Sequence, residues 1–211
     1  MSVDVKICGL KDRRAVDAAV SAGAKFVGFV FYPGSRQVIT ADHAQELAQP
    51  VPRSVTKTGL FVDATDDELK AVLSRVPLDL IQLHGHETPE RVTAVKALTG
   101  LPVMMAISIS AAEHLQNLPA YAAVADRLLF DTRVGDKPSG GTGKTFDWNL
   151  LKGVAITKPW MLAGGLKAEN LADAVRISGA KTVDVSSGVE DATGAKSPEK
   201  IKRLLELAEK L

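Results

Sequence analysis

Short apolar segments of strand length alternate with segments of helical periodicity along the whole chain. Several of the apolar segments are almost continuously hydrophobic, which is typical of strands that are covered on both faces. The segments between them carry apolar side chains three or four positions apart, as helices with one buried face do. The expected strands are residues 3–8, 26–31, 55–62, 79–84, 102–108, 127–131, 158–163 and 181–186.

The intervening segments predict helices that pack on the outside of a parallel sheet. Ser197 and Pro198 have the residue types preferred at a helix start, and Gly100 and Gly179 stand where helices would end. Eight strand-plus-helix units predict an α/β protein of the single-domain (β/α)8 TIM-barrel class. The alternative is a doubly wound open sheet, but the number of units favours closure. The clearest helical stretches are residues 13–23, 66–76, 89–100, 171–177 and 198–211.

Composition narrows the class of protein. The chain has 211 residues, of which 45% are hydrophobic, and no linker divides it, so we expect one catalytic domain over residues 1–211. The net charge of +1 comes without a basic block, which disfavours nucleic acid and anionic membrane surfaces as partners. No apolar segment approaches the ~20 residues that span a membrane. The single cysteine cannot form an internal disulfide, and this fits a reducing cytoplasm.

Two proton-handling side chains stand at the ends of predicted strands. Cys8 ends the first apolar segment and Asp131 ends the sixth, and glycine follows each of them closely. In a parallel barrel the active site lies at the carboxyl ends of the strands, where these two side chains can meet. They would then form a general base and a general acid that face one substrate. The alternative for a lone cysteine is that of a small buried hydrophobic residue.

Glycine and serine cluster in the loops after the seventh and eighth strands. Glycines let backbone N–H groups approach an anion closely, and hydroxyls add further donors. Phosphate-binding barrels frequently use these two loops, so we predict a phosphate site rather than two ordinary tight turns. The predicted phosphate-binding residues are Gly164, Gly165, Ser186, Ser187 and Gly188.

The segment GGTGKT at 140–145 resembles part of a nucleotide-binding phosphate loop. The full pattern requires a glycine at position 138, where this chain has Pro138, and a position after the first strand. A nucleotide hydrolase is therefore disfavoured. A glycine-rich lid that closes over bound substrate explains the segment better.

Arg36 and His84 are further candidates in the loops. The guanidinium of Arg36 is suited to a substrate carboxylate, although a lone loop arginine can also be a solvated charge. His84 ends the fourth strand, where it would contact substrate or simply cap the strand, whereas His86 is expected to be solvated. No cluster of residues has the spacing of metal ligands, so no metal is predicted.

In order and spacing, these loops closely resemble those of the phosphoribosylanthranilate isomerase family of tryptophan biosynthesis. The shared motifs run the full length of the chain and are KICG, GFVFYPGS, GLFV, IQLHG, FDT, GGTGKTFDW, LAGGL and VDVSSGVE. The resemblance implies a cofactor-independent intramolecular oxidoreductase, an aldose-ketose isomerase. It would convert a phosphorylated aminosugar, N-(5′-phosphoribosyl)anthranilate, to 1-(2-carboxyphenylamino)-1-deoxyribulose 5-phosphate by an Amadori rearrangement.

The resemblance also implies roles for individual residues. Cys8 is then the general base, Asp131 the general acid, and Asp184 lies near the ribose hydroxyls. For these roles we expect burial to raise the pKa of Asp131 and a nearby cation to lower that of Cys8. Lys6, two residues earlier on the same strand face, is the candidate cation.

One loop departs from the family pattern. The family assigns an arginine of the second loop to the anthranilate carboxylate, and alignment on Ser35 places Gln37 at that position and Arg36 one residue earlier. Because a loop can absorb such a shift, Arg36 is predicted to bind the carboxylate. The family includes monomers and dimers, so either state is expected.

Two alternatives remain. The related isomerase of histidine biosynthesis performs the same rearrangement, but its family has an aspartate near the end of the first strand, where this chain has Cys8. A non-catalytic barrel that binds a phosphorylated metabolite would keep the glycine-serine loops. It would have no use for the Cys8–Asp131 pair.

Overall fold

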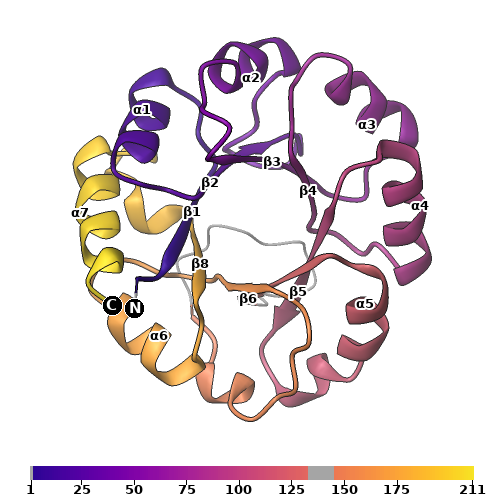
Figure 1. Cartoon of the computed structure of the whole chain (residues 1–211), viewed down its shortest axis with the longest axis vertical. Coiled ribbons are helices and arrows are strands. Elements are labelled where there is room, and N and C mark those ends of the chain that lie inside the picture. Colours follow the sequence, from indigo (N-terminus) through magenta and orange to yellow (C-terminus); the bar gives the residue numbers. More distant parts are fainter. Residues whose placement is uncertain (1, 133–144) are drawn as a thin grey trace.

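The computed structural model describes residues 2–132 and 145–211. Its strands form a closed parallel barrel in which each pairs with the next and β8 returns to β1 (Figure 1). The first and last strands pair through Asp4–Thr182 to Ile7–Val185, which closes the sheet. The strands are β1 (Asp4–Cys8), β2 (Phe26–Val30), β3 (Thr56–Phe61), β4 (Leu80–Leu83), β5 (Val103–Ile109), β6 (Arg127–Thr132), β7 (Trp160–Leu162) and β8 (Thr182–Val185).

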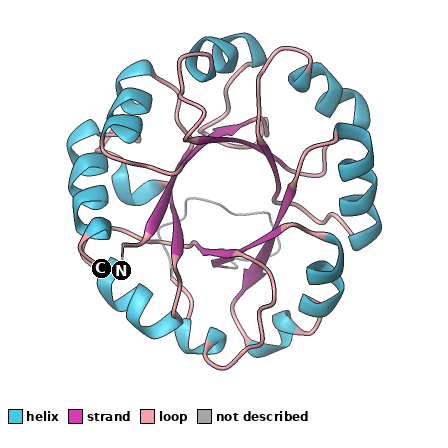
Figure 2. Cartoon of the chain, in the orientation of Figure 1, coloured by secondary structure: helices cyan, strands magenta, loops and turns pink. Residues whose placement is uncertain are grey.

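Helices surround the barrel as an outer ring (Figure 2). The α-helices are α1 (Arg13–Ser21), α2 (Ala41–Ala48), α3 (Asp66–Leu73), α4 (Pro89–Thr99), α5 (Leu118–Val124), α6 (Leu171–Ser178) and α7 (Pro198–Glu209). The 3-10 helices are η1 (Ala112–Leu115), η2 (Trp148–Leu151) and η3 (Ser187–Val189).

Local sequence explains where these helices begin and end. Thr65 and Thr88 accept hydrogen bonds from the first turns of α3 and α4, and Ser197 does the same for α7, which starts with proline. Gly100 and Gly179 follow α4 and α6 with positive φ, as glycine does after a helix. The end signals predicted from the sequence at Gly100, Gly179, Ser197 and Pro198 are confirmed.

Two apolar layers hold the barrel together. A large outer layer lies between the sheet and the helices. A smaller cluster fills the barrel and consists of Phe26, Leu80, Met104, Ala106, Leu129, Met161 and Ala163. This inner cluster leaves the carboxyl ends of the strands to polar side chains, which is where the predicted site residues stand.

The barrel class predicted from the sequence is confirmed, and each of the eight predicted apolar segments coincides with a strand to within one or two residues at either end. The described part of the segment before β7 begins at Thr145, and the only helix in it is the short η2. Of the proposed lid at 140–145, residues 140–144 lie outside the described residues. Within residues 2–132 and 145–211, no helix combines the length and the apolar character needed to cross a membrane.

Candidate active site

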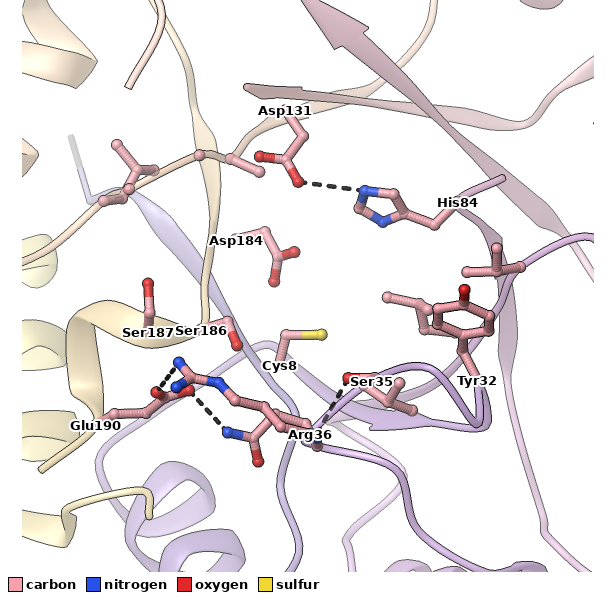
Figure 3. Close-up of a pocket in the computed structure, with 18 of the residues that line it drawn as sticks. Cys8, Tyr32, Ser35, Arg36, His84, Asp131, Asp184, Ser186, Ser187 and Glu190 are labelled. Carbon is pink, nitrogen blue, oxygen red and sulfur yellow. Dashed lines mark hydrogen bonds and ion pairs between the residues drawn. The ribbon is translucent and has the colours of Figure 1, made fainter. Parts of the chain in front are cut away.

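A cavity of about 330 Å³ opens at the carboxyl ends of the strands, which is a size typical of small-molecule sites. Nearly all of the predicted site residues line it, and Figure 3 shows them converging from several strands. The predicted residues that line the cavity are Cys8, Arg36, His84, Asp131, Gly164, Gly165, Asp184, Ser186 and Ser187. Gly188 stands behind them, outside the lining.

Cys8 lies at the end of β1 with 5% of its surface exposed. Its neighbour on β2 is Gly28, where an added Cβ would lie 3.1 Å from Sγ of Cys8 and 3.2 Å from Nζ of Lys6. Glycine at this position therefore makes room for the thiol and the ammonium together. Burial raises the pKa of the Cys8 thiol, and Lys6 offsets only part of that rise. The predicted lowering of the Cys8 pKa is wrong, because desolvation of the thiolate outweighs the attraction of the cation.

Lys6 is completely buried and donates a hydrogen bond of 3.0 Å to Oδ1 of Asp184. The two residues face each other across the β1–β8 seam. Burial acts to lower the pKa of Lys6, but Asp184 and Cys8 together raise it above the usual lysine value. Lys6 is thus the cation beside Cys8 that its position on the strand predicted. It also forms an ion pair with Asp184.

His84 and Asp131 face each other across the cavity mouth (Figure 3). Nε2 of His84 lies 3.2 Å from Oδ2 of Asp131, and both side chains are more than nine-tenths buried. The amide nitrogen of Gln82 lies 3.0 Å from Nδ1 of His84. Because an amide nitrogen only donates, Nδ1 accepts, and a neutral ring then carries its proton on Nε2. That proton points to the region of Asp131 and the cavity.

Asp131 is held from its own strand. Oδ1 accepts a hydrogen bond of 2.7 Å from the N–H of Thr132. Gly164 approaches from the next loop so closely that an added Cβ would lie 2.2 Å from Oγ1 of Thr132 and 3.0 Å from Oδ1 of Asp131. The glycine of the LAGGL motif therefore brings the backbone after β7 against the carboxyl group that ends β6.

The two glycine-serine loops lie side by side at the rim. Gly164 and Gly165 both have positive φ, and Gly188 packs so tightly that an added Cβ would lie 1.9 Å from the carbonyl oxygen of Leu166. Nζ of Lys196 donates to Oγ and to the backbone oxygen of Ser186, each at 2.9 Å. Lys196 was not predicted from the sequence, and it adds a buried cation behind the predicted phosphate site.

Comparison with known proteins identifies the family of this barrel. A family model described as N-(5'phosphoribosyl)anthranilate (PRA) isomerase matches residues 5–207. The chain belongs to the PRA isomerase family. It is 53% identical over 210 residues to the N-(5'-phosphoribosyl)anthranilate isomerase of Paramagnetospirillum magneticum, covering 99% of this chain and 98% of that one. The enzyme of the same name from Paracoccus denitrificans is 52% identical over 207 residues, covering 97% and 96%.

Solved structures of the PRA isomerase family agree with this assignment. The enzyme from Thermotoga maritima superimposes with a TM-score of 0.87 at 33% identity, covering 99% of this chain and 100% of that one. A family structure in complex with reduced 1-(o-carboxyphenylamino)-1-deoxyribulose 5-phosphate gives a TM-score of 0.85 at 32% identity, with the same coverage. The predicted family, barrel fold and aldose-ketose isomerase activity in tryptophan biosynthesis are therefore confirmed.

The loop after β2, in which the sequence predicted an arginine shifted by one position, places both candidate residues, Arg36 and Gln37, on the cavity. Arg36 is 63% exposed at the rim, and its Nη2 donates to Oε2 of Glu190 at 2.6 Å. Gln37 is 6% exposed and points its amide to Oε1 of Glu190 at 2.9 Å. Glu190 was not predicted from the sequence. Its only signal was an acid two residues after the SSG motif, and nothing in the sequence pairs it with the β2 loop.

Two buried side-chain atoms of the residues that line the cavity make no hydrogen bond to the described residues. They are Oε1 of Gln37 and Nε2 of His84, the latter held only in the 3.2 Å contact with Asp131. Unsatisfied buried polar atoms are costly, so both atoms fit a site that is completed by a polar ligand. In residues 2–132 and 145–211, no group of three or more His, Cys, Asp and Glu side chains could hold a metal ion. His86 is exposed and pairs with Asp63, as expected for a solvated histidine.

Proposed function

We propose that Asp131 and Cys8 are the general acid and the general base of the PRA isomerase reaction in this chain. Asp131 protonates the furanose ring oxygen of N-(5′-phosphoribosyl)anthranilate, and the ring opens to an iminium ion. Cys8 then removes the proton at C2, which gives an enolamine. The enolamine tautomerises to the ketone, 1-(2-carboxyphenylamino)-1-deoxyribulose 5-phosphate. No atom is gained or lost.

The observation that carries this proposal is the position of the two groups. The thiol of Cys8 and the carboxyl group of Asp131 line one cavity, both are buried, and they come from β1 and β6 (Figure 3). A proton donor and a proton acceptor on different sides of one substrate are what an aldose-ketose isomerisation requires. Asp184 stands between them in the same view and is placed to contact the sugar hydroxyls.

The remaining cavity residues supply binding at the two ends of the substrate. Gly164, Gly165, Ser186 and Ser187 border the space proposed for the phosphate, with Gly188 as the close contact behind them. At the other end, the guanidinium of Arg36 is proposed to bind the anthranilate carboxylate. Nε2 of His84, which lies 3.2 Å from Oδ2 of Asp131, is proposed to donate to the substrate beside that carboxyl group.

Turnover of substrate formed in situ, followed by the loss of its fluorescence, tests the assignment. Wild type is compared with Cys8→Ser and Asp131→Asn, which change the proton chemistry with little change in size. We expect wild-type turnover and a loss of about 10²–10⁴-fold in kcat for each variant. Circular dichroism of both variants serves as the control for folding.

Each contrary result has a distinct meaning. Undiminished kcat in either variant removes that residue from the mechanism. A wild type that binds substrate without turnover supports the non-catalytic phosphate-binding barrel. Turnover confined to the histidine-pathway aminoaldose supports the isomerase of that pathway, which the cysteine at the end of β1 disfavours.

The assembly and location of this chain stay predictions. We propose a monomer or a homodimer in the cytoplasm. One solved relative, 33% identical with a TM-score of 0.85, is described as mutually generated monomers of dimeric phosphoribosylanthranilate isomerase from Thermotoga maritima. Both states therefore occur for that protein.

A further inference from the structure

Glu190 is a buried carboxylate that joins two loops of the active site. It follows η3 after β8, and 6% of its side chain is exposed. Oε2 accepts a hydrogen bond from Nη2 of Arg36 at 2.6 Å, and Oε1 accepts from Gln37 and from Lys196, both at 2.9 Å. Figure 3 shows the guanidinium of Arg36 resting against this carboxylate. One side chain of the β8 loop therefore holds two neighbouring residues of the β2 loop.

Gln37 and Arg36 both contact Glu190, but from different depths in the site. Gln37 takes the inner, buried place, where its amide also donates to the carbonyl oxygen of Gly194 at 3.1 Å. Arg36 is left at the rim, with its backbone oxygen bound by Nζ of Lys11 at 2.9 Å. A long side chain that is mostly exposed samples many rotamers, and ordering it on binding costs affinity. The Glu190 contact orders the guanidinium before substrate arrives.

The charges around Glu190 leave a net positive charge, which suits an anionic ligand. The ammonium of Lys196, 1% exposed, pairs with the carboxylate of Glu190, so the buried acid is neutralised from behind. Together, Glu190, Lys196 and Arg36 therefore carry one positive charge in excess, and the exposed Arg36 lies at the cavity rim. Since Nη2 is engaged with Glu190, the other guanidinium N–H groups stay available to a carboxylate.

We propose that Glu190 is a positioning residue for Arg36 and thereby sets the affinity of this enzyme for the carboxylate of its substrate. Arg36 is predicted to stand one position early in the β2 loop, and its side chain is mostly exposed. The contact with Glu190 compensates for this, because it holds the guanidinium in one place at the rim. This inference rests on the proposed function of Arg36 in binding the anthranilate carboxylate.

A double-mutant cycle between Glu190 and Arg36 tests the proposal. In Glu190→Gln we expect KM to rise about tenfold with kcat almost unchanged, because binding is lost equally in the ground and transition states. Inhibition by free anthranilate, a probe of the carboxylate end, should weaken by a similar factor. In the Arg36→Ala background, Glu190→Gln should have almost no further effect, since the two residues act as one unit.

Two further variants make the outcome decisive. Glu190→Asp keeps the charge beside Lys196 but is shorter by one methylene, so it should reproduce the KM increase even if Glu190→Gln folds poorly. Glu206→Gln on the exposed face of α7 is the matched control and should leave KM unchanged. Equal KM increases with and without Arg36 would overturn the proposal and make Glu190 a structural residue. A wild-type enzyme that shows no turnover would instead overturn the proposed function.

Discussion

The protonation of Cys8 has a direct kinetic consequence at the scale of one residue. Because burial raises the pKa of its thiol, the base is mostly protonated at neutral pH, and the reactive thiolate increases about tenfold per pH unit below that pKa. We expect kcat/KM to rise with pH to above the ordinary cysteine value of about 8.5. Thiolate absorbance, measured against Cys8→Ser, should titrate over the same range.

Lys6 acts to lower the pKa of Cys8 and so opposes the effect of burial. Lys6→Met should therefore shift both the kcat/KM profile and the thiolate titration to still higher pH. Lys57→Met is the matched control, since Lys57 is also buried and paired with an acid, Asp79, but is not among the charges that shift the pKa of Cys8. Its profile should coincide with that of wild type. A Cys8 thiol that titrates at or below about 8.5 would contradict the desolvation argument.

The residues of the site differ in how far the sequence could predict them. Cys8, His84 and Asp131 stand at strand ends, and barrel topology alone brings strand ends together. Glu190 and Lys196 act through contacts with the β2 loop and with Ser186, which depend on side-chain reach between loops. Periodicity carries no information about such contacts. The sign of the Cys8 pKa shift also required the structure, because it depends on the balance of burial against charge.

At the scale of elements, the loops after β7 and β8 form one unit through Gly188. In Gly188→Ala the new Cβ would meet the backbone of Leu166, so the two loops must separate. We expect the KM for substrate and the inhibition constant of inorganic phosphate both to rise by about tenfold or more, with about 1–3 kcal/mol of lost stability. Gly100→Ala is the control, since it strains a positive φ in open space and should lower stability alone.

The elements themselves were largely predictable, because hydrophobic period distinguishes strand from helix over five or more residues. The predictions weakened where the pattern is short. Between β5 and β6 the chain forms η1 and then the seven-residue α5, neither of which the periodicity marked. Before β7 it forms only η2. Segments of one or two turns carry too few apolar positions to define a face.

At the scale of the whole molecule, barrel closure joins the two ends of the chain into one cooperative unit. Strand β1 pairs with β8, the N–H of Val3 donates to the carbonyl oxygen of Ala208 in α7, and α7 lies beside α1 (Figure 1).

Leu204→Ala in α7 removes a completely buried side chain, so we expect the free energy of unfolding in urea to fall by about 2–5 kcal/mol. Exposed Lys202→Ala should change stability by less than about 0.5 kcal/mol. Circular dichroism and the fluorescence of Trp148 and Trp160 should still report one coincident transition, because η2 and β7 cannot remain folded in an opened barrel. Separate transitions would show that α7 unfolds locally and that closure does not couple the ends.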